Sequence, residues 1–170
     1  MIETEVKPRI LVVMGVSGSG KSSLAMGLRD RLGWTFQEGD ELHPAANVAK
    51  MSAGIPLDDT DRAPWLAACA AWIRALHDAG KPGILTCSSL KRSYRTTLSQ
   101  GLPDVWFLYL KVPEAVLKER LDRRAHHYMP SSLLPTQLRT LEEPGADEQA
   151  VVVVAHTGIA ETVQAALDEL

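Results

Sequence analysis

Residues 15–22 constrain the fold of this chain more than any other segment, because they place glycines, a lysine and a serine in the pattern G-x4-G-K-S. A continuous apolar run over residues 10–14 comes directly before them. Residues 21–32 follow, with leucines that recur every four positions and a glycine immediately after the last of them. The run predicts a strand buried on both faces, and the leucine spacing predicts a helix. A glycine-rich loop between such a strand and helix is typical of a phosphate-binding P-loop.

The residue types of this loop suit a phosphate chain. Glycine lets backbone N–H groups approach phosphate oxygens and adopts positive φ without strain. The following helix begins with partial positive charge, Lys21 can bridge the β- and γ-phosphates, and the Ser22 hydroxyl can bind Mg²⁺. An ordinary glycine-rich turn would need neither side chain, so we predict ATP and Mg²⁺ as cofactors, with Lys21 catalytic and Ser22 the metal ligand. The predicted nucleotide-binding residues of the loop are Gly15, Val16, Ser17, Gly18, Ser19, Gly20, Lys21, Ser22 and Ser23.

Four further apolar segments resemble the first, and helical patterns separate them. Alternating strands and helices imply right-handed crossovers and a parallel sheet. The predicted fold class is therefore α/β, a P-loop NTPase whose five-stranded parallel sheet carries helices on both faces. At 170 residues the chain has enough length for one core, so we expect a single domain over residues 1–170. The four additional strands are predicted at residues 34–37, 84–87, 105–110 and 151–154.

Two segments between the strands have distinct characters. Residues 60–79 predict a helix with Thr60 or Asp61 as its N-cap, and Trp65 and Trp72 lie seven apart on one face, which favours a role in the core over a ligand platform. Residues 125–147 hold two histidines, a tyrosine and three prolines, and predict a helical lid over the edge of the sheet.

Composition narrows the classes of partner. The formal net charge of −3 and the pI near 5.9 provide no overall basic field, so we expect no nucleic-acid partner. The apolar runs are far shorter than the roughly 20 residues of a membrane-spanning helix, and the first nine residues do not form a signal peptide. We expect a soluble cytoplasmic protein without a membrane partner, with Cys69 and Cys87 as buried thiols.

Charged residues follow two of the predicted strands and suggest an acceptor site. Ligands of parallel α/β sheets bind beyond the carboxyl ends of the strands, and Asp40 comes directly after the second strand. It is predicted to orient or deprotonate an attacking hydroxyl, although a turn aspartate is the alternative. Lys91 and Arg95 stand four apart after the third strand, where they could hold a carboxylate or form a solvated helix face.

Arg120 and Arg124 share the same spacing at the entrance to the lid segment. An arginine that closes over the γ-phosphate neutralises charge during transfer and excludes water. We therefore predict both as nucleotide-binding residues and Arg124 as catalytic. The adjacent His126 and His127 lack cysteine or aspartate partners at metal-ligand spacing, which favours lid contacts over a zinc site.

Seven segments together resemble the gluconokinases of the short P-loop type, which are related to shikimate and adenylate kinases. The P-loop is common to many families, whereas GD-x-LHP followed by G-x-PL-x-D-x-DR-x-PWL is far more specific. The resemblance covers nearly the whole chain. Its segments are MGVSGSGKSS from Met14, GDELHP from Gly39, KMSAGIPLDDTDRAPWL from Lys50, CSSLKRSYR from Cys87, FLYLKV from Phe107, RAHHYM from Arg124 and LLPTQLRTLEEP from Leu133.

The resemblance implies a homodimeric kinase that transfers phosphate from MgATP to the 6-hydroxyl of D-gluconate and yields 6-phosphogluconate. Asp40 matches the residue that engages the accepting hydroxyl, and His43 a neighbour in the sugar-acid pocket. The resemblance also places Lys91 and Arg95 at the substrate carboxylate and Gln137 in the lid contacts, which completes the predicted substrate-binding set. It further places Arg120 near adenine and Arg124 near the phosphates.

Three positions depart from the family pattern, with Glu38 in place of aspartate, Tyr128 in place of phenylalanine and Pro135 in place of serine. None of them removes a predicted catalytic group. Two alternatives stay open at this point. One is a kinase of another small hydroxy acid, such as shikimate or a different aldonate, and the other is a non-catalytic module that binds ATP for regulation.

Overall fold

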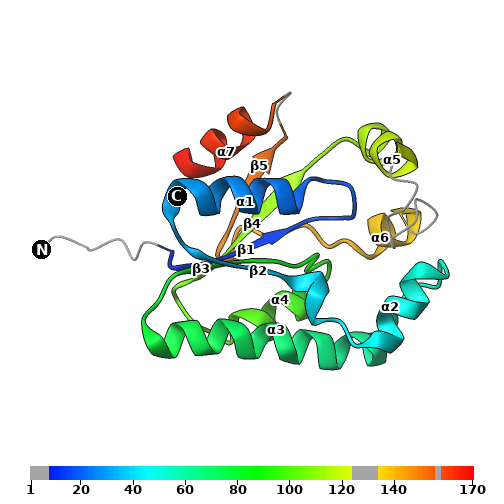
Figure 1. Ribbon diagram of the computed structural model, residues 1–170, viewed down its shortest axis with the longest axis horizontal. Coiled ribbons are helices and arrows are strands. Elements are labelled where there is room, and N and C mark those ends of the chain that lie inside the picture. The colour runs from blue at the N-terminus through cyan, green and yellow to red at the C-terminus, as the bar shows by residue number, and fades with distance from the viewer. Residues whose placement is uncertain (1–7, 124–133, 156–157) are drawn as a thin grey trace, which may run out of the picture.

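The computed structural model describes residues 8–123, 134–155 and 158–170 (Figure 1). Its centre is a parallel five-stranded sheet in the order β2-β3-β1-β4-β5. Strand β1 lies in the middle, in register with β3 from Ile10↔Gly83 and with β4 from Ile10↔Val105. The predicted fold class is confirmed. The strands are β1 (Ile10–Met14), β2 (Thr35–Glu38), β3 (Gly83–Thr86), β4 (Val105–Lys111) and β5 (Ala150–Val154), each within one residue of its predicted position at both ends.

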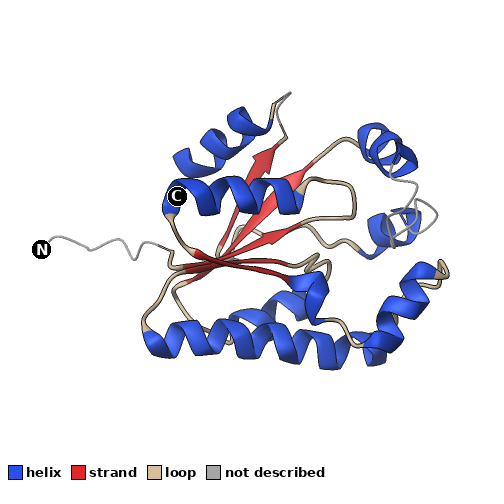
Figure 2. Cartoon of the chain, viewed as in Figure 1, coloured by secondary structure: helices blue, strands red, loops and turns tan. Residues whose placement is uncertain are grey.

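Helices cover both faces of the sheet, as Figures 1 and 2 show. Helices α1 and α7 lie on one face, α3 and α4 lie on the other, and α2, α5 and α6 gather beyond the carboxyl ends of the strands. The described helices are α1 (Lys21–Leu32), a 3-10 helix η1 (Gly39–Leu42), α2 (Ala45–Ser52), α3 (Asp59–Ala79), α4 (Arg92–Ser99), α5 (Glu114–Arg123), α6 (Leu134–Thr140) and α7 (Ile159–Asp168).

The side chains of β1 divide the core into two layers. Val13 packs with α1 and α7, whereas Val12 and Met14 pack with α3 and α4. All five residues of the strand are fully buried, which explains why its sequence is apolar throughout instead of alternating. Both predicted buried thiols, Cys69 of α3 and Cys87 just after β3, lie in the core layer between α3 and the sheet.

Helix α3 positions one wall of the site, and its start differs from the prediction. The N-cap is Asp58, not Thr60 or Asp61, because the Asp58 carboxylate accepts from the Asp61 N–H at 2.8 Å and the Asp61 carboxylate accepts from the Asp58 N–H at 3.1 Å. This reciprocal capping box begins the helix one residue earlier than predicted. Trp65 is 2% exposed, as expected of a core residue. None of the helices in the described ranges is long and apolar enough to cross a membrane.

Candidate active site

The P-loop joins β1 to α1 through a backbone that requires glycine. Gly15, Gly18 and Gly20 have φ values of 146°, 82° and 96°, and a Cβ at Gly15 would lie 3.0 Å from the Leu110 carbonyl oxygen of β4. Side chains larger than hydrogen would be strained at these positions. Helix α1 begins at Lys21, immediately after the left-handed Gly20. The N–H groups at the start of α1 therefore lie beside the loop, where they suit an anion.

Lys21 and Ser22 occupy the first turn of α1, and both side chains donate to oxygen acceptors. The Lys21 ammonium donates to the Gly15 carbonyl at 2.9 Å. It therefore lies across the P-loop, where it is predicted to bind phosphate. The Ser22 hydroxyl donates to Glu38 Oε1 at 2.6 Å, and the same oxygen accepts from Thr86 Oγ1 at 2.9 Å. The sequence marked Glu38 as a departure from the family pattern but did not predict its contact with Ser22, which forms because the end of β2 lies beside the P-loop.

The oxygen atoms around Ser22 fit Mg²⁺. Ser22, Glu38 and Asp40 line one small cavity together with the P-loop. Mg²⁺ prefers hard oxygen ligands and keeps several of its waters, so one hydroxyl with nearby carboxylates is a suitable donor set. Ser22 is the residue that would hold the ion directly, and the carboxylates would accept hydrogen bonds from its waters.

Helices α5 and α6 contact the opposite side of the P-loop. Gln137 on α6 accepts from the Ser17 N–H at 2.8 Å and donates to Ser17 Oγ at 3.1 Å. Arg120 on α5 donates to the Gly18 and Ser19 carbonyls at 3.3 and 3.1 Å. Arg120 was predicted to bind the nucleotide, and Gln137 was predicted to make a lid contact. Arg124, His126, His127 and Tyr128 lie outside the described residues.

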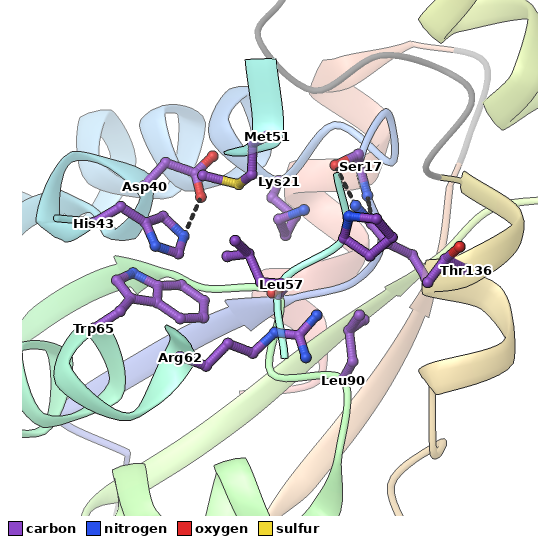
Figure 3. Close-up of a pocket in the computed structure, with 13 residues that line it drawn as sticks. Ser17, Lys21, Asp40, His43, Met51, Leu57, Arg62, Trp65, Leu90 and Thr136 are labelled. Atoms are coloured by element: carbon purple, nitrogen blue, oxygen red, sulfur yellow. Dashed lines mark hydrogen bonds and ion pairs between the residues drawn. The ribbon is translucent and has the colours of Figure 1, made fainter. Parts of the chain in front are cut away.

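A cavity opens beside the loop (Figure 3). Lys21 and Asp40 lie on one side of it, and Arg62 and Leu90 lie on another. The lining residues come from the P-loop, η1, α2, α3, α6 and the segments between them: Ser17, Lys21, Asp40, His43, Met51, Pro56, Leu57, Arg62, Trp65, Ser88, Leu90, Thr136 and Gln137.

Gly39 fixes the position of Asp40. Its N–H donates to Thr86 Oγ1 at 3.1 Å, and its carbonyl accepts from Trp65 Nε1 at 2.9 Å. A Cβ at this position would lie 1.8 Å from the Thr86 carbonyl oxygen, so only glycine allows η1 to approach the end of β3 this closely. Asp40 therefore follows a backbone held by both the sheet and α3, and its side chain is 43% exposed toward the cavity.

His43 lies beside Asp40 in the wall of the cavity. Its ring stacks on Trp65 with centroids 4.0 Å apart and an interplanar angle of 15°. The side chain is 3% exposed, and Nε2 lies 4.0 Å from Asp40 Oδ1. Burial lowers the pKa of His43 to about 4, although the nearby Asp40 charge opposes this shift. The ring is therefore neutral at physiological pH.

Lys91 and Arg95 do not form the predicted pair. Lys91 is the N-cap of α4, so its side chain is not on the same helix face as that of Arg95. The Lys91 ammonium instead contacts Asp59 at 3.0 Å. Arg95 is 1% exposed and pairs with Glu148, with 2.7 Å between Nε and Oε1. Neither residue lines the cavity described above. The two side chains therefore do not converge in the structure, and their contact with a substrate carboxylate stays a prediction.

Arg62 is a cation of the cavity wall that the sequence interpretation did not select. It comes from the first turns of α3 and lines the cavity, and its Nη1 donates to Tyr94 Oη at 3.0 Å. Its guanidinium also lies 5.5 Å from the centre of the Tyr94 ring. Arg62 stands inside the DDTDRAPWL segment that supported the family resemblance, but nothing in its spacing distinguishes it from a solvated helix residue.

Comparison with known proteins gives consistent results. The AAA domain family matches residues 10–144. The gluconokinase of Gluconobacter oxydans (strain 621H) is 57% identical over 148 residues, which cover 87% of this chain and 83% of that protein. A sugar kinase from Janibacter sp. HTCC2649 superposes with a TM-score of 0.88 at 46% identity, over 95% of this chain and 93% of that one. A gluconokinase from Sinorhizobium meliloti 1021 does so with a TM-score of 0.82 at 48% identity, over 95% and 90% of the two chains.

Proposed function

The chain belongs to the gluconokinase family, which lies within the wider family of AAA domains. Its activity is therefore the ATP-dependent phosphorylation of gluconate, and we propose here which residue carries out each part of that reaction. Lys21 and Asp40 line the same cavity, and this observation carries the assignment of roles. The P-loop supplies a place for the triphosphate, and η1 supplies a carboxylate where an attacking hydroxyl would enter. The product is 6-phosphogluconate.

The proposed reaction begins when Asp40 accepts a hydrogen bond from the 6-hydroxyl of gluconate. As O6 forms a bond to the γ-phosphorus, the bond from that phosphorus to the bridging oxygen of ADP breaks, and the hydroxyl proton passes to the Asp40 carboxylate. Lys21 stabilises the charge that moves onto the bridging oxygen. Bound Mg²⁺, held through Ser22, would supply further charge stabilisation. We keep Arg120 as a nucleotide contact and Gln137 as the link between α6 and the P-loop.

Arg62 takes the place that Lys91 and Arg95 were predicted to fill. Gluconate carries its carboxylate at the end of the chain opposite the 6-hydroxyl, so a substrate with its hydroxyl at Asp40 must place an anion elsewhere in the cavity. Arg62 is the guanidinium among the lining residues, and guanidinium groups bind carboxylates through paired N–H donors. We propose that this pairing selects acids over neutral polyols. We also propose a cytoplasmic homodimer, as the family resemblance implies.

Replacement of Asp40 by Asn tests the acceptor role. Asn keeps the shape but cannot accept the proton, so kcat with gluconate should fall by at least about a hundredfold, while the Kd for ATP should change by less than about threefold. Glu41→Gln is the matched control, because Glu41 is an exposed acid on the same 3-10 helix that does not line the cavity. Coupled detection of ADP gives kcat, and calorimetry gives the Kd for ATP.

The same assay separates the two alternatives. A panel of gluconate, other aldonates and shikimate would identify a kinase of another acid by a higher kcat/KM for that acid. ATP binding without turnover of any acid would indicate a regulatory module. Equal losses of ATP affinity and kcat in Asp40→Asn would move Asp40 to the nucleotide side of the site.

A further inference from the structure

Asn47 is a buried polar residue that the reaction described above does not use. It lies in α2, is 3% exposed, and does not line the cavity. Its amide nitrogen Nδ2 donates to the Asp61 carbonyl at 2.8 Å and lies 3.2 Å from Nδ1 of His43. A buried amide with two such contacts is expected to fix the groups around it.

The Asp61 carbonyl determines which way the Asn47 amide is turned. A backbone carbonyl only accepts hydrogen bonds, so the amide group that faces it must be the NH₂. The same nitrogen also faces His43 Nδ1, and its second hydrogen is available for that contact. Nδ1 of His43 must therefore be the acceptor. A neutral imidazole carries one N–H, so the proton belongs on Nε2.

Nε2 is the ring nitrogen nearest the reaction centre. It lies 4.0 Å from Asp40 Oδ1, and the ion-pair line in Figure 3 joins these two groups. This separation is too long for a direct hydrogen bond. An N–H donor beside a carboxylate acceptor instead matches a hydroxyl, which can donate its hydrogen to Asp40 and accept from His43 at the same time.

We propose that Asn47 is a positioning residue that holds His43 in the Nε2–H tautomer, so that His43 and Asp40 together bind one hydroxyl of the substrate. The identity of that substrate rests on the proposed function. With the proton on Nδ1, the ring would present a lone pair toward Asp40, and neither group could donate to the hydroxyl oxygen. The tautomer therefore decides whether the site fits a hydroxyl or repels its oxygen.

The surroundings of His43 support a neutral ring with one donor. Asp40 on η1 is the acid that faces it, Arg62 on α3 contributes a positive charge that opposes protonation, and Trp65 covers one face of the ring. Asn47 is the contact from α2. Lys50 on the same helix instead contacts both carboxylate oxygens of Asp61, at 3.0 and 2.8 Å.

Nitrogen-15 NMR of the ring provides a test that does not depend on turnover. In the wild-type protein at neutral pH, the His43 signals should show hydrogen on Nε2 and a lone pair on Nδ1. In Asn47→Asp the new carboxylate can only accept, so hydrogen should appear on Nδ1. Lys50→Met is the matched control, since it removes a contact between α2 and α3 without touching His43, and it should keep the wild-type pattern. A wild-type ring protonated on Nδ1 would overturn the proposal.

Kinetics give the second readout. Asn47→Asp should lower kcat/KM for gluconate by about tenfold or more with little change in the Kd for ATP. In a His43→Gln background, where the side-chain amide has its own donor, the same replacement should cost less than about threefold. An equal loss in both backgrounds would mean that Asn47 acts only through stability. Absence of gluconate turnover in the wild type would instead contradict the proposed function and leave the NMR test intact.

Discussion

At the scale of a single residue, the proposed role of Arg62 in selecting acids over neutral polyols can be tested by replacement. A charge-assisted hydrogen bond contributes roughly 1.5–3 kcal/mol, so Arg62→Met should lower kcat/KM for gluconate by at least about tenfold. The neutral polyol glucitol has no carboxylate, and its slow rate should change much less. Steady-state kinetics with both compounds measure the difference.

Lys91→Met is the control for this experiment, because Lys91 was predicted to bind the same carboxylate but contacts Asp59 in the structure. It should leave the preference for gluconate over glucitol within about threefold of the wild-type value. If Arg62→Met reduced both rates by the same factor, Arg62 would support the cavity wall and would not select the acid.

Helix α4 shows how an element can depend on one buried ion pair. Arg95 donates from Nη1 to the Ser89 carbonyl at 2.8 Å while it pairs with Glu148, so it ties α4 to the segment after β3 and to the turn before β5. Breaking a buried pair by removal of one partner costs about 3–5 kcal/mol, and Arg95→Met should lower the free energy of unfolding by that amount. The neighbouring exposed pair is the control, since Arg92→Met should cost less than about 1 kcal/mol. Urea denaturation measures both.

The Arg95–Glu148 pair also has a defined pH dependence. The hydrogen bond from Arg95 lowers the pKa of Glu148 below its ordinary value of 4.5. A carboxylate with a lowered pKa stabilises the folded state above the unfolded value, and this stabilisation is lost as the pH falls through the folded value. The stability gap between wild type and Arg95→Met should therefore be constant near neutral pH and narrow below about pH 4.5. A gap that stays unchanged down to pH 3 would contradict this account.

Elements with strong local patterns could be predicted from the sequence, and those that depend on capping could not. The five strands were found because each is a short apolar run that remains buried in a central layer. The start of α3 was misplaced because Asp58 and Asp61 are both good caps and only the geometry selects one. Lys91 and Arg95 contact different acids because spacing of four residues aligns side chains only when both belong to the helix, and Lys91 precedes it.

Ligand binding should stabilise the whole molecule, because the site joins segments from both sides of the sheet. Saturation at about a hundredfold excess over Kd adds about 2.7 kcal/mol, which corresponds to a rise in Tm of roughly 5–10 °C for a chain of this size. MgATP should produce this shift in thermal unfolding of the wild type. Lys21→Ala removes the side chain predicted to contact phosphate, and this side chain is not part of the hydrophobic core. The Tm of the ligand-free variant should therefore stay close to the wild-type value, while the rise in Tm caused by MgATP becomes much smaller. An undiminished shift would show that Lys21 does not hold the nucleotide.

The candidate site divides into parts that the sequence could and could not predict. The P-loop residues are contiguous, and the pattern of this one segment is enough to explain why glycines are needed in it. Asp40 followed from its place after β2, and this expectation agrees with its position in the cavity. Arg62, Asn47 and the contact between Ser22 and Glu38 depend on how distant segments pack. No local pattern distinguishes these residues from ordinary polar side chains.

The hydrogen bond from Trp65 to the Gly39 carbonyl makes α3 part of the acceptor half of the site, whereas the phosphate half belongs to β1 and α1. The two halves are thus built from separate stretches of chain. Replacements in the first turns of α3 can therefore redesign the choice of acid while the triphosphate cradle is left alone. A library confined to Arg62 in the first turns of α3 and to Leu57 just before that helix would explore new acceptors without replacing any residue of the P-loop.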